Sequence, residues 1–471
     1  MAAKSSAPAR RGSPPSLLSE PASRGQRAPP PGGHTSPDVL TPQTLEIVMV
    51  SFEGPDQYSL AGGLGVRARG LTQALAAAGY TTTLVFVGDP ALPADEVVEG
   101  VRLIRWCQEV SLSFPAGVYD GERAKLATLD RTLPAALVER VVAPAVERGR
   151  IVAVLCEEWH TASFCQALSD RLHEMDLRDR CVLLWNANNH FGWGEMDWPA
   201  LGFVASMTTV SRYMKQRMLG WGVNPVVIPN GIPESSLEPI SATDVAALRD
   251  AAGTPCLAFK IGRFTPDKRW LQAIDAIAEV RAGGVPARLL MRGGVEPHGG
   301  AVLARARDLG LGICEWDEPV EDAAGLVRAL RESRGCPVVN LGRFLPDDVI
   351  PVIDAAADAV LANSGHEPFG LVGLEAMAAG GVAVVGATGE EYARPYGNAI
   401  IIETDEGTEV AAALRGLVDR PALARRLRRN AHRDAREYAW PLVIEGLLER
   451  LQYMCAHQRV AVRDGTGAGG A

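Results

Sequence analysis

The sequence lacks several features that would each point to a particular class of protein. No apolar run approaches the roughly 20 residues that a membrane helix needs, so we expect no transmembrane segment. The N-terminus has basic residues but no apolar segment behind them, so we expect no secretory signal. The eight cysteines form no C-x-x-C pair, and a chain of 471 residues does not need a disulfide framework. We therefore expect reduced, buried thiols in a cytoplasmic protein.

Basic residues are also fewer than acidic residues. Lys and Arg number 47 against 56 Asp and Glu, which gives a formal net charge of −9 at pH 7. A mildly acidic chain argues against a nucleic-acid partner. The sequence also contains no Asp-x-Asp, the usual carboxylate pair for a nucleotide-bound metal ion, so we expect no metal site and no cofactor.

What the sequence does have is a repeated alternation of strand and helix patterns. The strand patterns are near-continuous apolar runs, as parallel strands buried on both faces require. Because the alternation occurs twice, it predicts an α/β fold of two Rossmann-like, doubly wound domains with a cleft between them. The predicted strands lie at 45–53, 81–88, 101–106, 151–158, 181–187, 206–211 and 224–232, and then at 256–264, 287–294, 337–344, 359–365, 381–388 and 399–403.

Composition gives the domain boundaries. A Pro/Ser-rich segment at the N-terminus cannot bury enough apolar surface to offset the entropy of ordering it, and a Gly-rich segment at the C-terminus is similar. We predict a disordered tail at 1–43, a first domain at 44–232, a linker within Pro229–Thr243, a second domain at 233–436, a closing helix at 437–457 and a flexible tail at 458–471.

The segment HEPFGLVGLE places two carboxylates around the start of a helix. Glu367 precedes the helix and Glu375 lies inside it, with Gly370 between them. The free N–H groups at a helix start bind anions, and glycine lets a ligand approach the backbone closely. A phosphate held there would leave the two glutamates to accept hydrogen bonds from hydroxyl groups of an attached ribose and sugar.

Two cations in GRFTPDKRW reinforce this interpretation. Arg263 and Lys268 follow a predicted strand and lie five residues apart. The planar fork of Arg and the point charge of Lys both suit a phosphate. Such residues are also common on solvated surfaces, so the motif indicates a diphosphate site only together with the strand–loop–helix context.

A glycine-rich segment follows the first strand and supports a second hypothesis. Gly62, Gly63 and Gly65 predict a flexible loop that leads into a helix. The pattern Gly63-x-Gly65-x-x-Ala68, followed by Asp89, also fits a dinucleotide fingerprint and hence a nicotinamide-dependent oxidoreductase. The fingerprint should lie in the turn directly after the strand, whereas a loop of about ten residues separates the two here.

Taken together, five segments resemble the family-4 retaining glycosyltransferases of GT-B fold, the group that includes glycogen synthases. The segments are AGGLGVRARGLTQALAAAGY, VIPNGI, GRFTPDKRW, HEPFGLVGLEAMAAGGVAVV and YAWPLVIEGLLERL, and the resemblance covers about residues 45–455. It implies transfer of a sugar from a nucleotide diphosphate sugar to an acceptor hydroxyl with retention of configuration. The first domain would bind the acceptor and the second the donor, and the last helix would cross back onto the first domain.

The resemblance also implies roles for single residues. Positions matching Arg263 and Lys268 contact the donor diphosphate in the family, and Glu367 matches the glutamate near the reacting sugar. We therefore take these three as candidate catalytic residues. The candidate donor-binding residues are Gly62, Gly63, Gly65, Gly370, Leu371 and Glu375.

Two departures from the family pattern bear on the acceptor side. Many relatives carry a histidine at the position of Ala187, and His190 is a possible substitute three residues on. The lysine that precedes the glycine loop in glycogen and starch synthases is absent, which disfavours a polymerising enzyme that uses ADP-glucose. CEEWHTA resembles a stretch of those synthases. The candidate acceptor-side residues are Glu158, His160, Asn188, His190 and Trp193.

Tryptophans near these residues have two interpretations. Trp185 lies on a predicted strand and suits core packing, whereas Trp193 and Trp198 lie beside glycine and proline in a predicted loop. Sugars bind to aromatic faces, so the loop tryptophans are the better acceptor-side candidates. Three alternative functions remain open: a related phosphorylase that uses free phosphate, the oxidoreductase, and a non-catalytic sugar-binding relative. The sequence names neither the sugar nor the acceptor.

Overall fold

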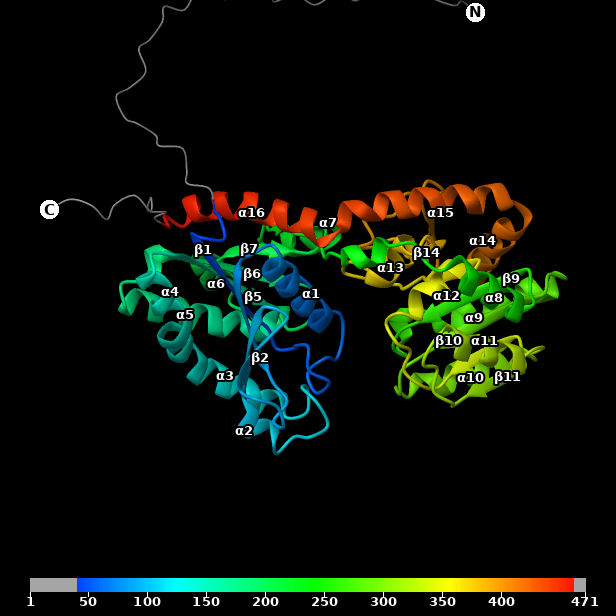
Figure 1. Ribbon diagram of the computed structural model, residues 1–471, viewed down its shortest axis with the longest axis horizontal. Coiled ribbons are helices and arrows are strands. Elements are labelled where there is room, and N and C mark those ends of the chain that lie inside the picture. The colour runs from blue at the N-terminus through cyan, green and yellow to red at the C-terminus, as the bar shows by residue number, and fades with distance from the viewer. Residues whose placement is uncertain (1–39, 461–471) are drawn as a thin grey trace, which may run out of the picture. The chain divides into compact units, whose positions relative to one another are not determined.

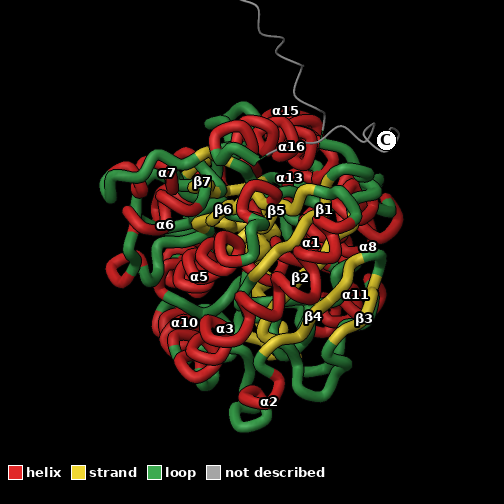
Figure 2. The backbone as a smooth tube through the Cα atoms, turned by 90° about the vertical axis from the view of Figure 1, so that its left-hand side faces the viewer, coloured by secondary structure: helices red, strands yellow, loops and turns green. Residues whose placement is uncertain are grey.

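The computed structural model describes residues 40–460, which form two predominantly parallel sheets covered by helices (Figures 1 and 2). In β1 (Leu45–Val50) and β5 (Ile151–Glu157) every residue is buried. Burial on both faces explains why the strand sequences are continuous apolar runs rather than alternating ones. The predicted fold class, two doubly wound α/β domains, is confirmed.

The first sheet has eight strands in the order β3-β4-β2-β1-β5-β6-β7-β8. All neighbours are parallel except β3, which is antiparallel to β4. The remaining strands of this sheet are β2 (Thr81–Val87), β3 (Asp95–Val98), β4 (Val101–Trp106), β6 (Cys181–Ala187), β7 (Ser206–Thr209) and β8 (Val226–Val227).

The second sheet has seven strands, all parallel, in the order β11-β12-β10-β9-β13-β14-β15. Its strands are β9 (Cys256–Ile261), β10 (Ala287–Arg292), β11 (Ile313–Trp316), β12 (Val338–Leu341), β13 (Ala359–Ala362), β14 (Ala383–Val385) and β15 (Ile400–Ile401).

Helices connect the strands in both sheets. The first domain contains α1 (Gly63–Ala77), α2 (Gln108–Ser111), α3 (Glu122–Leu137), α4 (Ala143–Glu147), α5 (Ala162–Glu174), α6 (Trp198–Val204) and α7 (Arg212–Leu219). The rest of the chain contains α8 (Ala242–Ala252), α9 (Trp270–Ala282), α10 (His298–Asp308), α11 (Ala323–Glu332), α12 (Ile350–Ala356), α13 (Leu371–Ala378), α14 (Gly407–Asp419), α15 (Pro421–Ala435) and α16 (Trp440–His457). Among residues 40–460, no helix is both long and apolar enough to cross a membrane.

The last helix packs on the first domain rather than on the second. Its apolar residues share a core cluster with β1, β2 and α1. At its start, the indole of Trp440 lies against two glycines, since a Cβ on Gly70 or Gly231 would come within 2.8 or 2.5 Å of the ring. The backbone of Ile232 holds the same point through hydrogen bonds with Tyr438 and Trp440. Helix α16, drawn in red, thus returns to the strands where the chain began (Figure 1).

The structure differs from the sequence prediction at both ends of the described chain. Residues 1–39 and 461–471 lie outside the described residues. Of the predicted N-terminal tail, Leu40 is buried, and its carbonyl accepts a hydrogen bond from Tyr80. Of the predicted C-terminal tail, Gln458 bonds to both backbone groups of Leu183. Leu40 and Gln458 therefore belong to the folded part of the chain, because hydrogen bonds with Tyr80 and Leu183 fasten them to it.

The sequence analysis missed two strands, β3 and β11, for the same reason. β3 and β11 are edge strands with mostly exposed or half-exposed residues. An edge strand with a solvated face does not need a continuous apolar run, so the pattern used to find the central strands does not apply to it.

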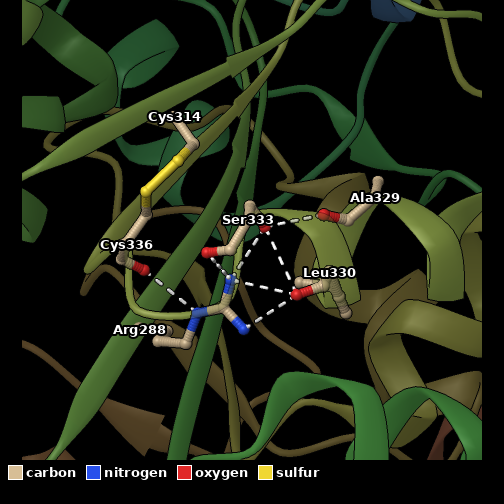
Figure 3. The surroundings of a disulfide bond; sticks show 6 residues. All are labelled: Arg288, Cys314, Ala329, Leu330, Ser333 and Cys336. Atoms are coloured by element: carbon tan, nitrogen blue, oxygen red, sulfur yellow. Dashed lines mark hydrogen bonds between the residues drawn. A yellow bond between two sulfur atoms is a disulfide. The ribbon is translucent and has the colours of Figure 1, made fainter.

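The prediction that all cysteines are reduced is wrong for one pair. Cys314 on β11 and Cys336 before β12 form a disulfide that closes a loop of 22 residues (Figure 3). Arg288 of β10 lies beside it and donates to the carbonyl of Cys336 and to Ser333. This pairing could not be predicted from the sequence, because the two cysteines come together only through the pairing of β11 with β12. The remaining cysteines in the described chain are free and buried.

Reduction of this disulfide should destabilise the second domain. Closing a 22-residue loop removes conformational entropy from the unfolded chain, so the bond should contribute about 3 kcal/mol to the free energy of unfolding. Denaturant unfolding with and without dithiothreitol measures this contribution. A Cys314→Ser/Cys336→Ser double variant should match the reduced parent and show no response to the reductant. Equal stability of oxidised and reduced parent would contradict the prediction.

Candidate active site

The order of strands reverses between β9 and β13 in the second sheet, and the predicted catalytic residues follow these two strands. Loops that leave a sheet at such a switch point run to opposite faces and leave a crevice between them. Arg263 and Lys268 lie in the loop after β9, and Glu367 lies in the loop after β13. A hydrogen bond of 2.7 Å from the N–H of Gly365 to the carbonyl of Asp267 joins the two loops.

Lys268 and Glu367 are in direct contact. The Lys268 ammonium is hydrogen-bonded to the Glu367 carboxylate, and both side chains are partly exposed. The backbone N–H of Glu367 donates to the hydroxyl of Thr388 at 2.9 Å, which fixes the carboxylate's position along the loop. Two residues that the sequence separates by about a hundred positions are thereby brought to one point.

Arg263 has a different environment. Its side chain is exposed, and its guanidinium has no bonding partner within residues 40–460. Its backbone is nevertheless fixed, because its carbonyl accepts a hydrogen bond of 2.8 Å from the indole of the buried Trp270. The loop therefore presents the unpaired guanidinium of Arg263 from a fixed position.

Gly370 caps the start of α13 in a conformation that favours glycine. Its φ is +81°, and a Cβ there would lie 2.7 Å from Glu390 and 3.1 Å from the hydroxyl of Tyr392. The Tyr392 hydroxyl donates to the Gly370 carbonyl. Leu371, the first residue of the helix, is half-buried. The helix start thus has a fixed backbone that lies next to Glu367.

Glu390 is a site residue that the sequence analysis missed. One of its oxygens accepts from the N–H and hydroxyl of Thr388, and the other is buried without a partner in the described chain. Burial, and then the charge of Glu367, raise the pKa of Glu390 to about 7. The sequence analysis could have found Glu390 from its position shortly after β14, the next strand of the sheet.

Glu375 lies one turn inside α13. Burial raises its pKa to about 7, and the nearby Asp347 carboxylate acts in the same direction. It is therefore held near the point of ionisation at neutral pH, unlike a solvated glutamate. Its ribose-binding role stays a prediction.

The glycine segment of the first domain is not the flexible loop that the sequence predicted. Gly62 caps α1, and Gly63 and Gly65 lie in its first turn. The carboxylate of Glu53 accepts the N–H groups of Gly62 and Gly65 at 2.8 and 3.0 Å. The sequence analysis missed Glu53 because this capping residue lies nine positions before the helix. A phosphate at this turn would have to displace Glu53 or bind elsewhere, for example near Gly63, beside which there is open space.

The first sheet also reverses its strand order, between β1 and β5, and Glu158 lies directly after β5. Its backbone has φ +70° and ψ 169°, a region that residues other than glycine rarely adopt. One carboxylate oxygen accepts the N–H groups of Asn188 and Asn189, and the other is buried without a partner in the described chain. Burial raises the pKa of Glu158 to about 8. A strained backbone that holds an incompletely bonded buried carboxyl indicates a functional position.

His160 and Asn188 lie beside Glu158. The imidazole of His160 is sandwiched between Phe52 and Trp159, and its Nε2 lies 2.9 Å from a carboxylate oxygen of Glu122. Burial lowers the pKa of His160, which favours the neutral ring. The side-chain oxygen of Asn188 and Nδ1 of His160 are both buried and, within residues 40–460, have no hydrogen-bond partner. Together with Glu158, they supply three polar atoms that a bound ligand could satisfy.

His190 lies between the candidate residues of the first domain and those of the second. Its ring lies edge-to-face with the ring of His366, 4.6 Å away between centroids. His366 is in turn 2.8 Å from the hydroxyl of Tyr213 on α7. Burial lowers the pKa of both histidines. The loop after β6 and the loop that carries Glu367 therefore meet at these rings.

The tryptophan prediction is wrong. Trp193 and Trp198 are 4% and 7% exposed and pack edge-to-face against each other, 5.5 Å apart between centroids. Trp198 also packs against Trp185, so the three rings form part of the core. Gly192 and Gly194 lie in a turn and a short 3-10 helix, whereas Pro199 lies with Trp198 at the start of α6, so this segment is not the open loop that composition suggested. Trp193 is thus a packing residue and no open platform for a sugar.

Residues 249–434 match the sequence model of the family described as "Glycosyl transferases group 1". The matched segment contains Arg263, Lys268, Glu367 and Glu375. This part of the chain is therefore similar to the group 1 glycosyltransferases.

Relatives and solved structures are consistent with this family over both domains. Over 423 residues the chain is 28% identical to a glycogen synthase of Mycobacterium tuberculosis, which covers 85% of this chain and 92% of that protein. Over 243 residues it is 28% identical to a GDP-mannose-dependent alpha-(1-6)-phosphatidylinositol dimannoside mannosyltransferase of the same species. That match covers 50% of this chain and about half, 54%, of the mannosyltransferase.

The fold itself is that of GT-B glycosyltransferases. The catalytic domain of starch synthase IV from Arabidopsis thaliana, bound to ADP and acarbose, superposes with a TM-score of 0.63 at 14% identity. The alignment covers 89% of this chain and all of that domain. The chain therefore has the two-domain architecture that the sequence predicted.

The raised pKa of Glu158 predicts a pH-dependent stability. The folded state retains a proton on Glu158 up to about pH 8, whereas the unfolded chain releases it near pH 4.5. Its contribution is therefore complete at low pH and is lost as the pH rises toward 8. Glu158→Gln cannot ionise, so its stability relative to the parent should increase by roughly 2–3 kcal/mol between pH 6 and pH 9.

Urea unfolding at the two pH values measures this difference. Glu147→Gln, an exposed glutamate on α4, is the matched control and should leave the pH dependence unchanged. A constant difference between Glu158→Gln and the parent would show that Glu158 is already ionised in the folded protein.

Proposed function

We propose that this glycosyltransferase moves a sugar from a nucleoside diphosphate sugar to an acceptor hydroxyl, with retention of configuration and without a metal ion. The observation that carries the proposal is the contact between Lys268 and Glu367 at the switch point of the second sheet, beside the start of α13. A cation, a carboxylate and a helix N-terminus meet there, and each has a partner on a sugar diphosphate. The ADP in the starch synthase IV structure supports a nucleotide ligand for this fold.

In this proposal the second domain stabilises the leaving diphosphate. Negative charge grows on the diphosphate as the bond to the sugar loosens, and Arg263, Lys268 and the N–H groups at the start of α13 lie where they can oppose it. Arg263 is unpaired in the described chain and needs no rearrangement, whereas Lys268 must leave Glu367 at least in part. Glu367 is then free to accept a hydrogen bond from the transferred sugar.

The acceptor hydroxyl would approach from the first domain, on the side of Glu158, His160 and Asn188. Their unsatisfied buried atoms support a hydroxylated ligand. Attack from the face of the leaving group gives retention, and an oxygen of the diphosphate takes the acceptor proton. No second carboxylate at glycosidase spacing is needed for this route. Many relatives have a histidine at the position of Ala187. In this proposal His190, which contacts His366, takes the place of that histidine.

A thermal-shift panel with UDP, GDP, ADP and TDP tests the central claim. A ligand at 100 times its Kd stabilises the folded state by ~2.7 kcal/mol. At least one nucleotide should raise the melting temperature, and the matching sugar nucleotides should then be offered with acceptors. If no nucleotide stabilises the protein, the proposal is wrong.

The two glutamates of HEPFGLVGLE should respond differently to substitution. Glu367→Ala frees Lys268, so the variant should bind the bare nucleotide at least as tightly as the parent. Its turnover should fall about 10-fold to 100-fold, since a hydrogen bond to a charged group is worth roughly 1.5–3 kcal/mol. Glu375→Ala should weaken the bare nucleotide and the sugar nucleotide by similar factors.

Calorimetry with the nucleotide and initial rates with the sugar donor separate these outcomes. Glu332→Ala, an exposed glutamate at the end of α11, is the matched control. If Glu367→Ala weakened the nucleotide as strongly as it slowed turnover, Glu367 would not act on the sugar.

Activity should survive an excess of EDTA. Protein cations at Arg263 and Lys268 take the place that a metal ion has in other transferases, and the sequence has no Asp-x-Asp. Initial rates before and after chelation measure this. Loss of activity with EDTA that Mg²⁺ or Mn²⁺ restores would overturn metal independence.

A further inference from the structure

A lysine is buried directly beneath the proposed diphosphate site. Lys260 is the fifth residue of β9, and only 2% of its surface is exposed. Its amine reaches across to β13, the strand on the other side of the switch point. There it donates to the carbonyl of Leu361 at 2.9 Å and to the side-chain oxygen of Asn363 at 2.7 Å. Asn363 begins the loop that carries Glu367.

The contacts of Lys260 are all with uncharged groups. An ammonium group has three N–H donors, whereas a neutral amine has two, and two acceptors receive hydrogen bonds here. Both acceptors are uncharged. The ring of Trp270 covers the amine, with its centroid 5.1 Å away. No carboxylate of the described chain is within hydrogen-bond distance of Lys260, so nothing in contact neutralises its charge.

The charged groups around Lys260 come from the two loops of the site. Lys268 and Arg269 oppose a positive charge on Lys260, while Glu367 and Asp267 favour it. Burial and then Lys268 lower the pKa of Lys260 to about 7. A diphosphate held by Lys268 would add negative charge on this same side, and would thereby reverse the balance.

We propose that the buried amine of Lys260 takes up a proton from solvent when a nucleoside diphosphate binds at the donor site above it. This inference rests on the proposed function. Lys260 has a positioning and an electrostatic role in this inference. Its amine orients Asn363 at the base of the loop, and it adds a third positive charge to those of Arg263 and Lys268 without touching the ligand. The amine becomes an ammonium, and the proton comes from the buffer acid.

The proton uptake is measurable in the parent protein. UDP, GDP and ADP are each titrated into the protein by calorimetry at pH 7.5 in three buffers of different ionisation enthalpy. The apparent binding enthalpy should change linearly with the buffer's ionisation enthalpy, with a slope equivalent to roughly half a proton or more taken up. Because the free protein holds Lys260 neutral above about pH 7, affinity should fall as the pH rises from 7 to 9, by up to about tenfold per pH unit.

Two variants assign the proton to its group. Lys260→Met keeps the length of the side chain and cannot titrate, so it should bind nucleotide with about half a proton less uptake than the parent. Lys215→Met, a half-buried lysine on α7, should keep the full uptake. If Lys260→Met does not fold, Lys260→Arg, whose guanidinium stays charged at every pH tested, should show the same loss of proton uptake, and full uptake in that variant would overturn the proposal.

The outcomes separate the two proposals. Nucleotide binding without proton uptake, or uptake that persists in Lys260→Met, would overturn the role of Lys260 and leave the glycosyltransferase proposal intact. Failure of all three nucleotides to bind would reject the donor site itself, and the inference with it.

Discussion

The reversal of strand order between β9 and β13 determines where the chemistry of this molecule can occur. Connections from these adjacent strands leave the sheet toward opposite faces, so no helix covers the edge between them. The side chains that end the two strands are thus left facing a shared space. Lys268 from one loop and Glu367 from the other meet there, and the start of α13 adds backbone donors. The first sheet repeats the arrangement with Glu53 after β1 and Glu158 after β5.

Buried charged side chains in this molecule are of two kinds: some are paired with an opposite charge, and others, among them Lys125, Arg288 and Lys260, contact only uncharged acceptors. Arg67 is paired with Glu157, and Arg105 with Asp56, both almost completely buried. Such pairs compensate each other and need no ligand. Lys260 is also buried but contacts only uncharged acceptors. Lys260 differs from Lys125 and Arg288 in its place beside the loop that carries Glu367, where a bound diphosphate would supply negative charge.

A second group of polar atoms shows the same pattern in the first domain. One oxygen of Glu158, Nδ1 of His160 and the side-chain oxygen of Asn188 are buried and unsatisfied within the described residues. The strained backbone of Glu158 would relax if this position had only to pack. Both halves of the site therefore retain unfavourable local features, which a donor on one side and an acceptor on the other can relieve.

The sequence predicted those parts of the fold and site that depend on local pattern. Central strands could be found because burial on both faces requires apolar residues throughout, and the loop positions of Arg263, Lys268 and Glu367 followed from the strands. Features that depend on contacts between distant segments were missed. Glu53 accepts a hydrogen bond from the helix cap Gly62, nine residues away, Cys314 meets Cys336 only through strand pairing, and Trp193 is buried against Trp198 of α6.

The contact of Trp440 with Gly70 and Gly231 has a consequence for how this chain can be recombined with its relatives. The indole occupies space that a side chain on either glycine would fill, and the three residues come from the first helix, the end of the first domain and the last helix. A chimera that exchanges only the second domain together with its trailing helix would import a new residue at position 440 against unchanged glycines. Crossovers should therefore be chosen so that all three positions are inherited from one parent.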